Sequence, residues 1–138
     1  MKRRYVFDAC SLIAYINDED GADIVDRLLS EAFSGGVATQ MGKVNLLEVY
    51  YGVLRDFGLS QAEEVLKEIS AYPIQIIHDI SDSVFREAGK LKARYKLSLA
   101  DALALGLASV SGDILVTADH HEMDIIEQQE KIKFLWIR

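Results

Sequence analysis

The sequence predicts an α/β fold in which a central parallel sheet lies between two layers of helices. Two observations predict it. Short runs rich in β-branched and aromatic residues alternate with longer amphipathic segments, and those short runs are apolar almost throughout. The chain has 138 residues, of which 50% are hydrophobic. It contains no linker, repeat or low-complexity segment, so we expect a single domain over 1–138.

The first elements are a strand at Arg4–Phe7 and a short helix at Ser11–Ile16. A second helix is expected to begin at Asp20, because aspartate is a preferred helix-cap residue. It should end at the Gly35-Gly36 pair. Its predicted inward residues are Ile24, Leu28 and Phe33.

The middle of the chain continues with a short strand at 37–39 and a third helix from Gln40 to Asp56. Gly58 separates this helix from a fourth, which is expected to start with the capping box Ser60-x-x-Glu63. The apolar run Ile74–Ile77, just after the single proline, is the next strand. The predicted apolar stripe of the third helix is Val44, Leu47, Tyr51 and Leu54.

The last third of the chain predicts an amphipathic helix at Ser81–Lys96 and a strongly apolar one at Ser98–Ser111, stopped by Gly112. The apolar helix is expected to be central and buried. The remaining predicted elements are a strand at Ile114–Thr117, a helix at His120–Gln129 and a strand at Lys133–Ile137.

Composition excludes several classes of protein. The net charge of −7 argues against a protein that holds nucleic acid by bulk electrostatics. A single cysteine, Cys10, rules out an internal disulfide and favours a reducing compartment. No apolar stretch is long enough to span a membrane, and we find no signal peptide. We therefore expect a cytoplasmic protein without membrane association.

Four acidic residues occupy positions typical of a catalytic site. In open parallel sheets, sites form at the carboxyl ends of strands. Asp8 follows the first strand directly, and Asp119 comes two residues after Ile114–Thr117. Asp101 is the one charge between Leu97 and Gly112, and Glu48 lies among apolar neighbours inside the third helix.

A simpler interpretation exists for three of these acids. Asp8 could cap the helix expected near Ser11, and Asp119 could be an N-cap with Glu122 as its capping-box partner. Asp101 lies three residues after Ser98, so these two could form a capping-box variant. Glu48 has no such role, and burying its carboxylate is costly without compensation. Grouped carboxylates repel one another, whereas Mg²⁺ or Mn²⁺ prefers such oxygen ligands and can activate water between them.

Four stretches of this sequence resemble the PIN domain family, and most closely its VapC-like ribonuclease toxins. They are VFDACSLIAYI, NLLEVYYGVL from Asn45, LSLADALALGLA from Leu97 and ILVTADHHEMD from Ile114. The resemblance implies a PIN-like three-layer fold and a Mg²⁺- or Mn²⁺-dependent endoribonuclease. It also implies the toxin of a type II toxin–antitoxin pair, with a cognate antitoxin and a homodimer as partners.

By the same resemblance, the family's catalytic and metal-binding acids fall on Asp8, Glu48, Asp101 and Asp119. Thr117 and Asn45 match polar residues that support the metal ligands. Cys10 stands where the family often has Ser, Thr or Asn, and a thiol is a weaker hydrogen-bond donor than a hydroxyl. We expect Cys10 to be a small buried residue rather than a nucleophile. Candidates for the dimer face are Tyr15, Tyr50 and Tyr51.

Basic residues recur every four positions at Arg86, Lys90 and Arg94, on one face of a predicted helix. They form either a solvated surface or a ridge that contacts RNA phosphates. The runner-up function is a non-catalytic PIN-type module that binds RNA or protein. Two other classes fit less well. A receiver domain needs a phosphorylatable aspartate after the strand 37–39, and this chain has none there. An Asp-x-Asp phosphatase needs a second aspartate two residues after Asp8, where this chain has Cys10.

Overall fold

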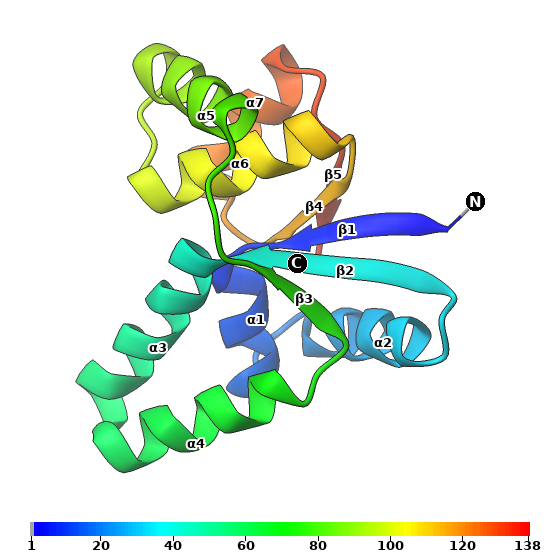
Figure 1. Ribbon diagram of the computed structural model, residues 1–138, viewed down its shortest axis with the longest axis vertical. Coiled ribbons are helices and arrows are strands. Elements are labelled where there is room, and N and C mark those ends of the chain that lie inside the picture. Colours follow the sequence, from blue (N-terminus) through cyan, green and yellow to red (C-terminus); the bar gives the residue numbers. More distant parts are fainter. Residues whose placement is uncertain (1) are drawn as a thin grey trace.

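The computed structural model describes residues 2–138, in which a five-stranded sheet lies between two layers of helices (Figure 1). The strands are β1 (Arg3–Phe7), β2 (Val37–Gly42), β3 (Ile74–Ile77), β4 (Ile114–Thr117) and β5 (Phe134–Trp136). The helices are α1 (Ala9–Ile16), α2 (Ala22–Phe33), α3 (Lys43–Phe57), α4 (Leu59–Ser70), α5 (Asp82–Arg94), α6 (Leu99–Ser111) and α7 (His120–Gln129).

All strand pairs are parallel, and the strand order is β3-β2-β1-β4-β5, which confirms the predicted sheet. The chain moves outward from β1 through β2 to β3, then returns to the other side of β1 to form β4 and β5. The direction of winding therefore reverses beside β1. In parallel sheets this reversal opens a crevice at the carboxyl ends of the strands.

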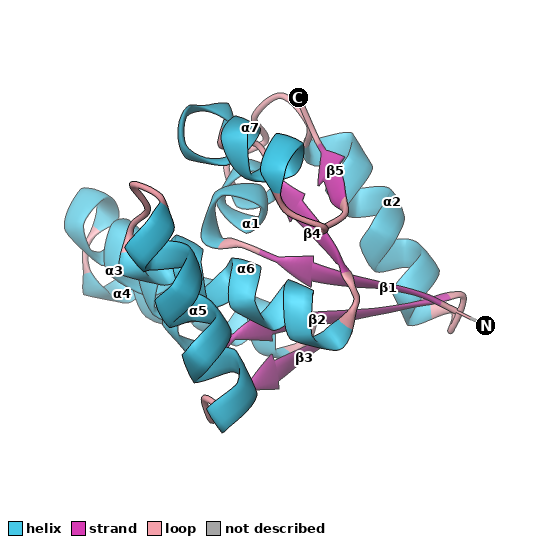
Figure 2. Ribbon diagram, turned by 90° about the horizontal axis from the view of Figure 1, so that it is seen from above, coloured by secondary structure: helices cyan, strands magenta, loops and turns pink. Residues whose placement is uncertain are grey.

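The central strand β1 contributes to both hydrophobic cores because its side chains alternate between the two faces of the sheet. Tyr5 and Phe7 pack with α1, α2, α3 and α4. Val6 packs with α5, α6 and α7 on the opposite face. Figure 2 shows the helices on both sides of the sheet. No described helix has the length and apolar character needed to cross a membrane.

Strand β2 is longer than the predicted 37–39 and reaches Gly42, so α3 begins at Lys43 rather than Gln40. Gln40 is a poor sequence signal for a buried strand, yet it is buried here. Its Nε2 donates a hydrogen bond to Oδ2 of buried Asp113 at 2.7 Å, which compensates both polar groups. The partner that makes Gln40 acceptable in the sheet lies far away in the sequence.

Helix α3 buries a different face from the predicted one. Its buried residues are Asn45, Leu46, Val49 and Val53. The predicted stripe is instead solvent-accessible, with Leu47 at 55%, Tyr51 at 47% and Leu54 at 37% exposure. Both faces of this helix are apolar, so hydrophobic periodicity alone could not choose between them; packing against α1, α4 and α6 does.

Several helix ends also differ from the predictions. Helix α2 starts after Gly21 rather than at Asp20. Gly21 has φ +96°, and a Cβ there would lie 2.6 Å from the Ile137 carbonyl oxygen, so the cap position requires glycine. The expected inward residue Phe33 is 83% exposed. Helix α4 begins at Leu59 after Gly58, and Glu63 accepts a hydrogen bond from Tyr50 instead of forming the predicted capping box. Helix α5 ends at Arg94, two residues before the predicted Lys96.

Gly106 lets α6 pack closely against α5. A Cβ at this position would lie 3.1 Å from the Ala88 nitrogen and 3.2 Å from the Val84 carbonyl oxygen, both backbone atoms. We predict that Gly106→Val lowers the free energy of unfolding by about 1–3 kcal/mol through overpacking. Gly89→Val is the matched control, since a Cβ there meets nothing within 4 Å. Urea denaturation measures both, and equal stabilities would contradict the prediction.

Candidate metal centre

Asp8 is held by the turn that joins β1 to α1. As the N-cap of α1, it accepts a hydrogen bond through Oδ1 from the Ser11 backbone nitrogen at 2.8 Å. The side chain is buried, with 1% of the residue exposed. Its second oxygen, Oδ2, has no hydrogen-bond partner among the described residues. Capping therefore uses one oxygen and leaves a buried carboxylate oxygen without a partner.

This environment makes ionisation of Asp8 costly. Burial raises its pKa to about 6, and the charge of Asp119 adds to the increase. The polar groups of Thr117 and Ser11 beside the carboxylate lower the pKa but do not outweigh burial. A cation bound at this carboxylate would reverse that cost.

Three further carboxylates converge beside Asp8. One oxygen from each of Asp101, Asp119 and Glu122 lies within 4.8 Å of the others. Helix caps orient two of them. The Asp101 backbone nitrogen donates to Oγ of Ser98 at 3.1 Å, and the Glu122 backbone nitrogen donates to Oδ1 of Asp119 at 3.3 Å. The capping interpretation is thus confirmed for Asp8 and Asp119, which are N-caps. It is also confirmed for Ser98, which caps α6 by accepting from the Asp101 backbone nitrogen.

The pKa of Asp101 is raised to about 9, first by burial and then by the neighbouring Glu122, which can share its proton. The charges of Asp8 and Asp119 raise it further. Without a cation, Asp101 therefore keeps a proton at neutral pH. The carboxylates lie close enough together to repel one another strongly.

Glu48 completes the group from α3. It is half-buried and lines the same pocket as Asp101 and Asp119. Burial raises its pKa, and the charges of Asp8 and Glu122 raise it further. The structure therefore brings all four acids named from the sequence to one place, at the crevice beside β1. Their metal-binding and catalytic roles stay predictions.

Glu122 was not identified as a site residue from the sequence, which suggested only that it follows the cap residue Asp119 at the start of a helix. A helical side chain leans toward the helix N-terminus, so an acid three residues after Asp119 returns to the same end of α7. The three-residue spacing between Asp119 and Glu122 could therefore have identified Glu122 as a site residue. The same spacing is also typical of a capping box, and that interpretation was preferred.

The supporting residues have partners that the sequence does not reveal. Asn45 is buried, and its Nδ2 donates to the Ala100 carbonyl oxygen at 3.1 Å. It therefore holds α3 against the start of α6 rather than contacting a carboxylate of the site. Thr117 accepts a hydrogen bond at Oγ1 from the Asp119 backbone nitrogen at 3.1 Å.

Cys10 lines the acidic pocket and is half-buried rather than fully buried. Burial and the charge of Asp8 raise the pKa of its thiol to about 11. A thiol that stays protonated at neutral pH is a poor nucleophile. The structure therefore agrees with a packing role for Cys10.

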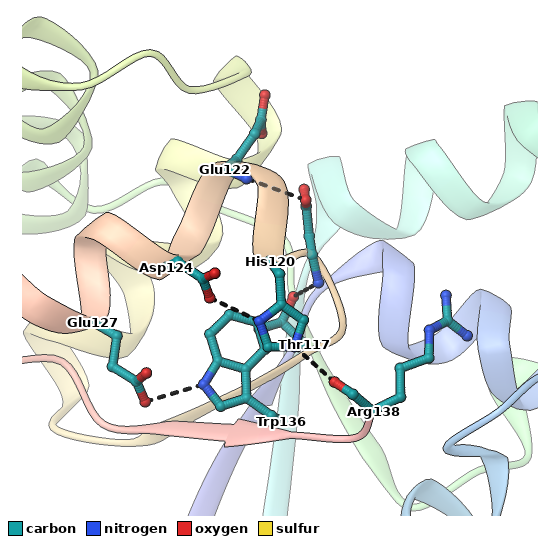
Figure 3. Close-up of polar contacts among 8 residues, drawn as sticks. Thr117, His120, Glu122, Asp124, Glu127, Trp136 and Arg138 are labelled. Atoms are coloured by element: carbon teal, nitrogen blue, oxygen red, sulfur yellow. Dashed lines mark hydrogen bonds and ion pairs between the residues drawn. The ribbon is translucent and has the colours of Figure 1, made fainter.

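The start of α7 is fixed by His120, as Figure 3 shows. Its ring stacks on Trp136 with centroids 3.9 Å apart. Nδ1 lies 2.7 Å from Oδ1 of Asp124, and Nε2 lies 2.8 Å from the Arg138 carbonyl oxygen. Both neighbouring oxygens accept hydrogen bonds, so the geometry satisfies both nitrogens only when the ring is protonated. The Arg138 carbonyl, followed by Asp124, raises the pKa of His120 accordingly.

The contacts of His120 help to position Asp119, which precedes it, and Glu122, which follows it. Trp136 is itself held by a hydrogen bond from Nε1 to Oε2 of Glu127 at 3.0 Å (Figure 3). The stack ties β5 to the first turn of α7, which carries Asp119 and Glu122. The histidine thus acts on the carboxylate geometry through the helix rather than as a ligand.

The predicted basic ridge lies on the exposed face of α5. Arg86, Lys90 and Arg94 do not line the acidic pocket. Nη1 of Arg94 donates to Oε2 of Glu130 at 2.9 Å, so this arginine already has a carboxylate partner. The role of the ridge in binding RNA stays a prediction.

The residues present fit a hard divalent cation. The donors are carboxylate oxygens, which Mg²⁺ and Mn²⁺ prefer, and one of them is buried without a partner. Burial first, and neighbouring carboxylates second, raise the pKa values of Asp8, Glu48 and Asp101, so a nearby cation would favour their ionised forms. The oxygens at this site are therefore suited to a cation of this kind.

Comparison with known proteins places this site in a family context. The sequence profile of the PIN domain matches residues 5–127. No curated protein compared with the sequence matches it significantly.

Solved structures share the fold at low sequence identity. A DNA-bound VapBC from Salmonella typhimurium has a TM-score of 0.75 and 16% identity, covering 100% of both chains. VapBC2 from Rickettsia felis, bound to a promoter DNA fragment, has a TM-score of 0.73 and 17% identity over 96% of this chain and 97% of that chain. Mycobacterium tuberculosis VapC20, described as a toxin that cleaves the sarcin-ricin loop, has a TM-score of 0.64 and 14% identity over 85% and 91%.

The raised pKa values predict how stability depends on pH. The folded protein holds protons on Asp8 and Asp101 that the unfolded chain loses near the ordinary pKa of aspartate. Stability should therefore fall as pH rises from about 4 toward about 9, since the folded state binds more protons in that window. Tm of the EDTA-treated protein tests this. Added Mn²⁺ should raise Tm more at high pH, because the cation replaces protons. A Tm that rises with pH in EDTA would contradict the prediction.

Replacing Glu122 tests separately whether it repels the neighbouring carboxylates and whether it contributes to cation binding. Glu122→Gln should raise Tm of the EDTA-treated protein, because it removes one of the repelling charges. The same change should weaken Mn²⁺ binding by about tenfold or more, measured by isothermal titration calorimetry. Glu64→Gln on the exposed face of α4 is the matched control and should alter neither. Unchanged Mn²⁺ affinity in Glu122→Gln would exclude the residue from the site.

Proposed function

This chain belongs to the PIN domain family, and from that premise we propose that it is a Mg²⁺- or Mn²⁺-dependent endoribonuclease, the toxin of a type II toxin–antitoxin pair. One observation carries the proposal. Asp8, Glu48, Asp101, Asp119 and Glu122 converge at the crevice beside β1, and Oδ2 of Asp8 is buried there with no partner among residues 2–138. A module that only binds RNA or protein has no use for such a cluster, which costs stability without a cation.

The proposed chemistry uses the acids as ligands. Asp8, Asp101 and Asp119 would hold the cation, with Glu122 beside them. Glu48 reaches the same pocket from α3 and would complete the ligand set. A bound cation would favour the ionised form of Asp101, because positive charge lowers its raised pKa. A bound divalent cation supplies an activated water and neutralises charge that develops on the phosphodiester.

RNA is proposed as the substrate because of the site and one structural neighbour. VapC20 is described as a toxin that cleaves the sarcin-ricin loop, which supports RNA as the substrate class. Several other neighbours are VapBC complexes, which supports a cognate antitoxin as a partner. A cytoplasmic location follows for an enzyme that acts on cellular RNA.

Exposed apolar side chains on α3 support a protein partner, either the antitoxin or a second copy. Leu47, Leu54 and Phe57 are exposed at 55%, 37% and 66%. Leu47 also lines an apolar groove between α3 and α4. The tyrosines considered for a dimer face fit it less well. Tyr15 and Tyr50 are half-buried and donate hydrogen bonds to Asp26 and Glu63, while Tyr51 lines the acidic pocket.

Cleavage of RNA tests the proposed function directly. Purified protein should cut RNA in Mg²⁺ or Mn²⁺ and not in EDTA. Asp8→Asn and Asp101→Asn should each lower the rate more than a hundredfold, because each removes a charge that holds the cation. Asp23→Asn, on the exposed first turn of α2, is the matched control and should retain the wild-type rate. Cleavage that survives Asp8→Asn and Asp101→Asn, or persists in EDTA, would overturn the proposal.

A further inference from the structure

The acidic pocket extends beyond the carboxylates along α3. Its volume is about 330 Å³. Besides the acids, its lining includes Tyr51, Gly52 and Arg55. Residues three, four and seven positions after Glu48 lie on the same face of a helix, so these three continue the line that Glu48 begins. Arg55 is about 10 Å from Glu48 along the helix axis, the length of two helical turns.

Arg55 is available for a ligand. Among the described residues that line the pocket, it is the one with a positive charge. It pairs with Asp56, the next residue, through hydrogen bonds of 2.9 Å from Nε and 3.3 Å from Nη2, and the two side chains are 68% and 53% exposed. An ion pair this exposed to water contributes little, so the guanidinium can exchange Asp56 for another anion. By contrast, Arg138 is tied to Glu19 and to the Asp20 carbonyl oxygen. A guanidinium fork matches the geometry of a phosphate.

Tyr51 presents an aromatic face beside this cation. The residue is 47% exposed, and its hydroxyl has no hydrogen bond within the described part of the chain. A Cβ on Gly52 would meet nothing within 4 Å, so the surface next to Tyr51 is open. An exposed ring in an open pocket is a stacking platform for a base of any sequence.

We propose that Tyr51 and Arg55 form a binding subsite for the nucleotide next to the cleaved phosphodiester, with its base on Tyr51 and its phosphate on Arg55. This inference rests on the proposed ribonuclease function. The pocket combines three groups that suit single-stranded RNA. The guanidinium suits a phosphate, the open aromatic ring suits a base, and the carboxylate cluster suits the cation at the cleaved phosphodiester. They match a protein segment less well, since such a segment offers no repeating anion. A discrete subsite also explains how a chain of net charge −7 holds RNA.

The test uses the 138-residue protein in Mg²⁺ and a fluorescein-labelled single-stranded RNA of mixed sequence. Fluorescence anisotropy on the Asp8→Asn background, where the RNA stays intact, gives the dissociation constant. Cleavage kinetics with Asp8 present give kcat and KM. We expect Arg55→Ala to weaken binding about fivefold and to raise KM more than it lowers kcat. The plot of log affinity against log salt should become shallower by about 0.7, the value for one phosphate contact on a single strand.

Tyr51→Ala should weaken binding about fivefold or more without changing the salt slope, because stacking involves no counterion release. Tyr51→Phe should restore most of that affinity, since it keeps the ring. Arg27→Ala, on the exposed part of α2 and outside the pocket lining, is the matched control. Arg86→Ala tests the α5 ridge in parallel. Mn²⁺ affinity without RNA should stay at the wild-type value in every variant, which separates the subsite from the metal centre.

The outcomes distinguish this inference from the proposed function. Wild-type affinity and salt slope in both Arg55→Ala and Tyr51→Ala would overturn the subsite while leaving the nuclease intact. The subsite would likewise be overturned if these variants disrupted self-association but not RNA binding, because the surface would then be a protein interface. Wild-type protein that binds RNA through these residues without cleaving it would overturn the nuclease and support the subsite. Protein that neither binds nor cleaves RNA would overturn both.

Discussion

Electrostatic repulsion among the clustered carboxylates is the constraint on which this structure depends. Asp8 is buried, and one of its oxygens has no partner in the described part of the chain; burial and neighbouring acids raise the pKa of Asp101 well above the ordinary value of an aspartate. A fold that assembles such charges without a cation gives up stability, because desolvation and like-charge repulsion both disfavour ionisation. The acids make physical sense together as ligands, and the same property that destabilises the cation-free protein suits it to bind a hard cation.

The fold tolerates this repulsion because helix termini anchor the acids. Asp8 and Asp119 cap α1 and α7, and Ser98 at the cap of α6 accepts a hydrogen bond from the backbone of Asp101. A carboxylate has two oxygens, so a cap residue can hold its helix with one and offer the other. The positive end of each helix dipole also favours a nearby negative charge. Capping and metal binding are therefore compatible roles for the same residues rather than competing ones.

The supporting contacts come from outside the pocket. Asn45 ties α3 to the start of α6, and the stack of His120 on Trp136 ties β5 to the start of α7. Gly106 allows α5 and α6 to approach closely, which sets the position of the helix that carries Asp101. The arginines that form ion pairs differ in their position. Arg4 and Arg94 pair with carboxylates outside the pocket, and Arg138 pairs with Glu19. Arg55 lines the pocket, and its only ion pair among the described residues is the exposed one with Asp56.

The sequence by itself determined the alternation of strands and helices, the parallel sheet and the meeting of Asp8 with Asp119 at one edge. These depend on local propensity and on the rule that parallel strands share one carboxyl edge. Tertiary structure alone decided which face of α3 is buried, because both faces are apolar and only the neighbouring helices distinguish them. It also decided that Gln40 extends β2, since its partner Asp113 is distant in sequence. Local spacing places Glu122 at the same end of α7 as Asp119, but its approach to Asp101 on α6 depends on how separate segments pack, which local pattern cannot encode.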